Sequence, residues 1–96
     1  MTTMQIRNTV RDFEEWKQSF DKFERFRADH GVRSYRILRH AGRDDLVDVA
    51  LDFDSLETAQ EFRRHLDKIW QTPQSQAQLI SHEEPVLLDV VVQRTL

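Results

Sequence analysis

The chain has 96 residues, of which 39% are hydrophobic and 32% are charged, and it carries a formal net charge of −3. This composition is typical of a folded soluble domain, and the lack of cysteine excludes disulfides and thiolate metal sites. Basic and acidic residues are interspersed without the basic stripe that binds phosphates, so we expect no nucleic-acid partner. No apolar run approaches the roughly 18 residues of a membrane span, and the first residues do not resemble an export signal, so we expect a cytoplasmic protein with no membrane partner.

The first predicted strand spans residues 4–10, where apolar and polar side chains alternate. Asp12 is the expected N-cap of a helix that continues to about Asp29. Aromatic residues recur along this helix at spacings of three and four and cover an arc of roughly 140°. They are Phe13, Trp16, Phe20, Phe23 and Phe26. We therefore expect a buried aromatic helix face, followed by Gly31 in the left-handed conformation that ends a helix.

An antiparallel hairpin is expected next. Its strands should span residues 32–41 and 46–53, and residues 42–45 should form the tight connection between them. The register that makes both faces chemically consistent pairs Tyr35 with Phe53. The same register sets His40 opposite Asp48, which predicts an ion pair between them.

The last third of the chain predicts one helix, one loop and one strand. The helix is expected to begin at an N-cap formed by Asp54 or Ser55 and to end near Trp70. A loop with one short helical turn should occupy residues 71–84, and residues 85–93 should form a strand buried on both faces. The order βαββαβ predicts an α+β fold of ferredoxin-like topology, with a four-stranded antiparallel sheet and two helices on one face.

Two helices cover only one face of such a sheet, so the other face needs another cover. Apolar residues assigned to that other face are Leu38, Ala50, Leu87 and Val91. A second copy of the sheet would cover them, and we expect a homodimer. The alternative is a monomer with an open sheet face, because several polar residues share that face and tolerate water.

Three segments carry a resemblance to a known superfamily, and they read VRDFEEWKQSF, HGVRSYRILRH and LDFDSLETAQEF. With them the chain resembles dimeric α/β-barrel proteins, and in particular small members grouped with antibiotic biosynthesis monooxygenases and polyketide cyclases. The resemblance implies that residues 1–96 form a single domain whose sheet packs against that of a second copy. It also implies a ligand cavity in each subunit, between the helices and the sheet.

Cofactor-independent monooxygenases of that superfamily let aromatic substrates that form stabilised carbanions react with oxygen directly. Haem-degrading relatives instead use a histidine ligand on the second helix, an asparagine on the first strand and a tryptophan. Asn8 matches the asparagine, but His65 stands where the tryptophan would be and Ser75 where the histidine would be. We therefore expect no cofactor, and no histidine pair has the spacing of a metal site.

Three residues are candidates for catalytic contacts: His65, Tyr35 and Asn8. His65 has a side chain suited to a general base near neutral pH, although a surface position is the commoner role for such a histidine. Tyr35 carries a hydroxyl that needs a partner when it is buried. Asn8 lies among apolar residues on the first strand, so a ligand, a backbone group or a water must satisfy its amide.

Aromatic residues are numerous for so small a core, and aromatic walls bind planar ligands by offset stacking. The candidate substrate-binding residues are Trp16, Phe20, Phe23 and Phe62, each of which can also simply fill the core.

Two functions remain open. One is a cofactor-independent oxygenase or cyclase acting on an aromatic, polyketide-like small molecule, and the other is a non-catalytic binding or interaction module of the same fold.

Overall fold

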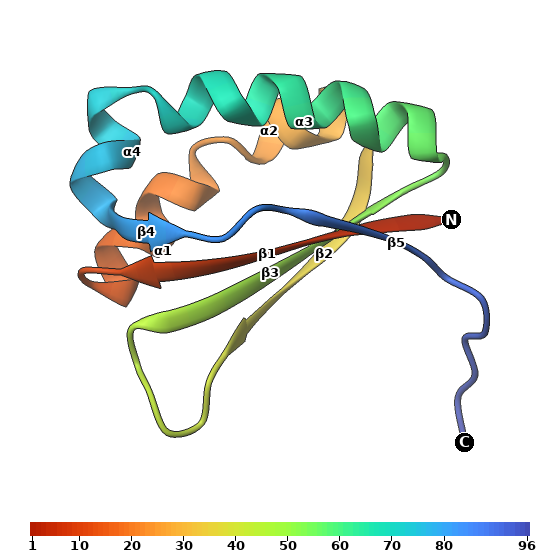
Figure 1. The fold of residues 1–96 in the computed structure, drawn as a ribbon, viewed down its shortest axis with the longest axis horizontal. Helices are drawn as coiled ribbons and strands as arrows, with labels where there is room; N and C mark the ends of the chain where they lie inside the picture. Colours follow the sequence, from red (N-terminus) through yellow and green to blue (C-terminus); the bar gives the residue numbers. More distant parts are fainter.

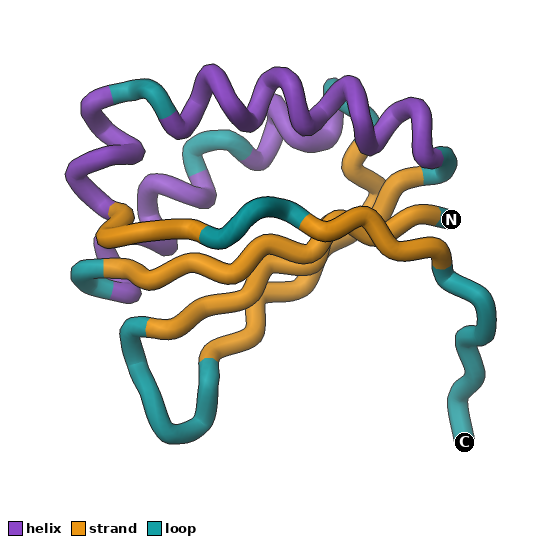
Figure 2. The backbone as a smooth tube through the Cα atoms, viewed as in Figure 1, coloured by secondary structure: helices purple, strands orange, loops and turns teal.

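The computed structural model describes residues 1–96, apart from the side chain of Gln74. The elements in chain order are β1 (Thr2–Val10), α1 (Phe13–Asp21), α2 (Glu24–Asp29), β2 (Val32–Arg39), β3 (Leu46–Phe53), α3 (Leu56–Trp70), α4 (Pro73–Gln78), β4 (Leu79–His82) and β5 (Val86–Asp89). The helices lie together on one face of the sheet, and the segment after β5 leads away from both layers (Figures 1 and 2). No helix among the described residues is long and apolar enough to cross a membrane.

The sheet is antiparallel and has the spatial order β2-β3-β1-β4, with β5 also paired to β1. β4 pairs with residues 8–10 of β1, and β5 pairs with residues 2–5 of the same strand. The two short strands therefore share one edge position, where the sequence predicted a single strand. The predicted α+β ferredoxin-like fold is confirmed, and its fourth strand is divided into two segments.

The core lies between this sheet and the helices. Alternate residues of β1 and β3 supply most of it, and α1 and α3 supply Trp16, Ala59 and Phe62. Met4 of β1 and Phe53 at the end of β3 are completely buried. The face of β1 that the alternation predicted to be apolar is therefore the face that meets the helices.

The first helical segment is broken, whereas the sequence predicted one continuous helix. Asp12 caps α1 as expected and accepts a hydrogen bond from the Glu15 amide. The backbone then turns at residues 22–23 before α2 begins. Arg27 donates from Nη2 to the Phe20 carbonyl oxygen at 2.7 Å, which satisfies one of the carbonyls at the end of α1. The break leaves Trp16 as the one fully buried ring of the predicted arc, and the other four are half-buried.

The predicted register of the hairpin is wrong by two residues. Tyr35 pairs with Leu51, and a bulge between Val32 and Ser34 shifts the ladder relative to a regular hairpin. Because the shift is even, the side chains from Ser34 to Arg39 keep their predicted faces. Val32, before the bulge, pairs with Phe53 and lies in the core instead. The predicted ion pair survives, with His40 Nε2 at 3.4 Å from the Asp48 carboxylate.

The prediction of a last strand buried on both faces is wrong for the single chain. β5 ends at Asp89, and beyond it Val91 is 88% exposed. Leu87 was assigned to the open face, but it pairs with Met4 and packs against the core. The apolar residues of this strand that do lie on the open face are Val86 and Leu88, opposite Gln5 and Thr3.

Candidate functional site

A cavity of about 110 Å³ lies between the sheet and the helices, bordered by residues of β1, β3 and all four helices. It contains five of the seven residues that the sequence nominated. They are Asn8, Trp16, Phe20, Phe23 and Phe62. A volume of this order suits one aromatic ring, since an engineered apolar cavity of roughly 150 Å³ accepts benzene.

Aromatic rings form a wall of two contacting groups on the helix side of the cavity. The ring centroids of Trp16 and Phe20 are 5.2 Å apart with the planes tilted by 33°. On α3, Phe62 contacts Phe53 at 5.4 Å and Phe26 at 6.1 Å. These spacings are those of favourable aromatic pairs, so the wall is held by its own contacts and offers ring faces to a planar ligand.

Polar groups on the lining come from both layers. Asn8 projects from β1 and is 5% exposed, and no hydrogen bond of its side chain is found in the described part of the chain. Thr72, Ser75 and Gln78 line the cavity from the segment that contains α4. No histidine is among the lining residues that the structure describes.

Arg27 is the charged residue of the lining, and the sequence analysis overlooked it. Its side chain is 7% exposed, and its guanidinium carbon lies 3.5 Å from the centroid of the Phe20 ring. Nη2 donates to the Phe20 carbonyl and, at 3.3 Å, to Glu24 Oε2. The helical spacing carried the signal, because position 27 falls seven residues after Phe20 and thus inside the aromatic arc.

Tyr35 does not line the cavity. Its hydroxyl donates to Glu24 Oε2 at 2.6 Å, and its ring meets the edge of Phe20 at a centroid distance of 5.2 Å. This hydrogen bond lowers the pKa of Glu24 and raises the pKa of Tyr35. Tyr35 borders a separate polar hollow on the surface, which Arg27 and Arg33 also line.

His65 also lies outside the cavity. It precedes Leu66 on α3 and occupies the flank that faces α2, where its ring centroid is 5.7 Å from that of Phe26 and 4.4 Å from that of His30. The cavity-facing positions of α3 include those of Phe62 and Leu66, one turn apart. A histidine at this position meets no molecule held in the cavity.

Trp70 is a further residue of the site that the sequence analysis did not nominate. It lines the cavity at the end of α3, and its ring stacks on His82 of β4 with centroids 3.7 Å apart and planes within 13°. The spacing of eight residues from Phe62 places it on the same helix face, which is the signal that could have identified it.

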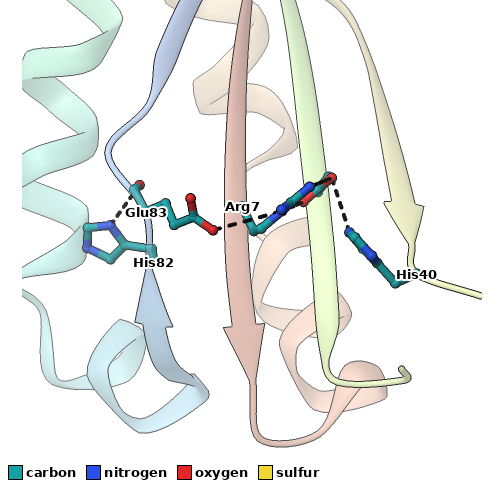
Figure 3. Close-up of polar contacts among 5 residues, drawn as sticks. Arg7, His40, His82 and Glu83 are labelled. Atoms are coloured by element: carbon teal, nitrogen blue, oxygen red, sulfur yellow. Dashed lines mark hydrogen bonds and ion pairs between the residues drawn. The ribbon is translucent and has the colours of Figure 1, made fainter. Parts of the chain in front are cut away.

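The opposite face of the sheet carries a row of charges (Figure 3). Arg7 donates from Nε and Nη2 to the Asp48 carboxylate at 2.9 and 3.2 Å, and Arg7 Nε is also 3.9 Å from Glu83. Hydrogen bonding from Arg7 lowers the pKa of Asp48. A hydrogen bond from His40, directly after β2, lowers the same pKa further. Among the described residues, no group of three or more potential ligand side chains is arranged to hold a metal ion.

Solved structures with a similar arrangement of helices and strands include a cofactor-independent oxygenase and a dimeric ferredoxin-like protein. SnoaB, a cofactor-independent oxygenase from Streptomyces nogalater, is 21% identical, covers 99% of this chain and 95% of its own, and superposes with a TM-score of 0.70. A dimeric ferredoxin-like protein from an uncultured marine organism is 10% identical, with 99% of each chain covered and a TM-score of 0.66. The chain has a ferredoxin-like fold.

A third similar structure is a candidate antibiotic biosynthesis monooxygenase from Nitrosomonas europaea, which is 11% identical and has a TM-score of 0.63 over 96% of this chain and 100% of its own. No protein-family model matches the sequence, and no curated protein matches it. The resemblance to the superfamily of antibiotic biosynthesis monooxygenases is therefore confirmed at the level of the ferredoxin-like fold.

Proposed function

We propose that this protein binds an aromatic, polyketide-like small molecule in the cavity and acts on it as a cofactor-independent oxygenase. The aromatic cavity with buried polar groups carries this proposal, and the fold shared with SnoaB supports it. A cyclase acting on the same class of substrate would use the same cavity.

Each part of the lining has a proposed role in this function. Trp16, Phe20, Phe23 and Phe62 would hold one ring of the substrate by offset stacking. Asn8 would donate from its amide to a substrate carbonyl and stabilise the negative charge that develops there when the substrate loses a proton to water and becomes a carbanion. The substrate itself would supply the electrons that reduce oxygen, so no redox cofactor is required.

A non-catalytic binding module is the second candidate, and one observation favours it. His65, which was nominated as a general base, and Tyr35, which was nominated for a polar contact, both lie outside the cavity. A carrier needs the aromatic wall and the polar contacts but needs no base. The two candidates therefore share the binding step and differ only in whether the bound molecule then reacts.

Tryptophan fluorescence tests the shared binding step. Both indoles border the cavity, so planar phenolic compounds should quench the emission saturably, and the Trp70→Phe variant should retain a saturable response from Trp16. Trp16→Phe is the matched variant and should retain the response of Trp70. An absence of saturable quenching by any of the compounds would contradict a binding cavity at this place.

Oxygen uptake separates the enzyme from the binding module. An oxygenase should consume oxygen and release an oxidised product when a bound phenolic compound can form a stabilised carbanion. Replacement of Asn8 by Ala should then slow turnover more than it weakens binding, because the amide acts mainly on the charged intermediate. Saturable binding without oxygen uptake or any product would leave the binding module as the function.

We also propose that two copies of residues 1–96, each a single domain, associate through the open faces of their sheets. The exposed apolar residues Leu38, Val86 and Leu88 on that face support this assembly, as does the dimeric ferredoxin-like neighbour. A cytoplasmic location is proposed as well, in keeping with a chain that has no cysteine. Sedimentation velocity at micromolar concentration should report a dimer, and a monomer would contradict the assembly.

A further inference from the structure

Two buried polar atoms of residues that line the cavity lack a hydrogen-bond partner among the described residues. They are Nε of Arg27 and Oε1 of Gln78, and they come from α2 and from the last residue of α4. Buried polar groups are almost always hydrogen-bonded, because leaving one unpaired loses the hydration that it has in the unfolded chain. Two such atoms on one cavity indicate that a polar ligand completes it.

The environment of Arg27 indicates the charge of that ligand. Nη2 is engaged by the Phe20 carbonyl and by Glu24, but Nε has no acceptor. The Glu24 side chain is 61% exposed and also accepts the hydroxyl hydrogen bond of Tyr35. The buried positive charge of Arg27 is therefore paired with only one carboxylate, which lies largely in solvent. A second anionic group beside Nε would accept a charge-assisted hydrogen bond and stabilise the buried charge.

The shape and chemistry of the remaining lining restrict the ligand further. The guanidinium lies over the Phe20 ring, so an anion that accepts from Nε sits at the edge of the aromatic wall. The cavity of about 110 Å³ leaves room for a ring of roughly benzene size next to that anion. The unpaired Oε1 of Gln78 is a hydrogen-bond acceptor, so a hydroxyl group on the same ligand would be a suitable donor to it.

We propose that Arg27 is a binding residue of the cavity that accepts a negatively charged oxygen, carboxylate or phenolate, on an aromatic ligand. The inference rests on the proposed function, because it names the chemical class of the molecule that the cavity binds. It assigns to Arg27 a charge-assisted hydrogen bond from Nε to that oxygen. No proton transfer or redox step is assigned to the residue.

Calorimetric titration with matched probes tests the assignment. The probes are 3-hydroxybenzoate and its neutral isostere 3-hydroxybenzamide, and the acid should bind about tenfold more tightly to the unmodified protein. 4-Nitrophenol distinguishes phenolate from carboxylate recognition, because its affinity should rise when the pH exceeds the value at which its hydroxyl ionises. Equal affinity for the acid and the amide, with no rise for 4-nitrophenol, would overturn the role of Arg27 and leave the cavity as a binding site.

Matched variants then locate the anion. Arg27→Met should reduce the affinity for the acid about tenfold and leave that for the amide within twofold. Arg33→Met removes an arginine that borders only the surface hollow next to Tyr35, and it should change neither affinity. A loss caused by Arg33→Met and not by Arg27→Met would place the anion in the surface hollow and overturn the inference. If neither acid nor amide binds the unmodified protein, the proposed function and the inference fail together.

Discussion

The side chains that line the cavity differ in how deeply they are buried. Phe62 is 2% exposed and contacts Phe53 and Phe26, so it belongs to the core and to the cavity wall at once. Phe23 is half-buried in the turn between α1 and α2, although the helical arc predicted it to be buried. The two phenylalanines therefore line the same cavity with different consequences for stability.

Replacement of Phe62 by Ala should lower the free energy of unfolding by about 3–5 kcal/mol, because it opens a hole in the core that the surroundings fill only in part. Phe23→Ala is the matched control and should cost clearly less, since the ring is already partly hydrated. Urea titrations of both variants at neutral pH provide the comparison. Equal losses would contradict the different burial of the two rings.

The carboxylate of Asp48 should make stability depend on acid pH. Its pKa is lower in the folded chain than its ordinary value, because Arg7 donates hydrogen bonds to it. A lowered folded pKa contributes stability that is complete above the unfolded pKa of about 3.9 and is lost as the pH falls through the folded pKa. The difference in unfolding free energy between the unmodified protein and Asp48→Asn should thus be largest at neutral pH and shrink below pH 4. A difference that stays constant from pH 7 to pH 2.5 would show that the carboxylate charge is not what Arg7 stabilises.

Among the structural elements, the junction of α2 and β2 depends on one backbone conformation. Gly31 has φ of +96°, in the region that side chains disfavour. A Cβ atom at this position would lie 2.3 Å from Cγ2 of Thr58 on α3. The glycine thus allows the chain to turn and lets α3 approach the start of β2.

Gly31→Ala should destabilise the fold by about 1–3 kcal/mol through backbone strain, and the contact with Thr58 adds to it. Gly42→Ala is the matched control, since its added methyl group meets nothing within 4 Å and its φ is not positive. Thermal unfolding followed by circular dichroism measures both. Removal of the Thr58 methyl group in Gly31→Ala/Thr58→Ser should recover part of the loss, and no recovery would mean that strain alone accounts for it.

Local patterns predicted the type of each main element because alternation and helical spacing depend on neighbours in the sequence. The break between α1 and α2 was not predictable in this way, since the Arg27 side chain and the Phe20 carbonyl stabilise it only once the chain has folded. The bulge at the start of β2, which places Val32 on the core face, is likewise a tertiary feature. Residue spacing placed the aromatic wall correctly, but Tyr35 and His65 were nominated for their chemistry without knowing which neighbours would cover them.

At the scale of the whole molecule, the proposed dimer depends on the open face of the sheet. Leu38 and Leu88 on that face are 43% and 44% exposed, and Leu56 at the start of α3 is 45% exposed on the other side of the fold. Leu38→Glu and Leu88→Glu should shift the protein to a monomer in sedimentation experiments, because a buried charge opposes association. Leu56→Glu should leave the dimer unchanged. Dissociation by Leu56→Glu, or by none of the three, would contradict association through the sheet.

Chemical-shift mapping gives the most direct test of ligand binding between the helices and the sheet. A planar phenolic compound should be titrated into isotopically labelled protein while the side-chain signals are followed. Binding in the cavity predicts saturable shifts at the Trp16 indole and the Asn8 amide, with the signals of the hairpin connection unchanged. Shifts confined to the hollow at Tyr35 or to the open face of the sheet would contradict the cavity as the site of function.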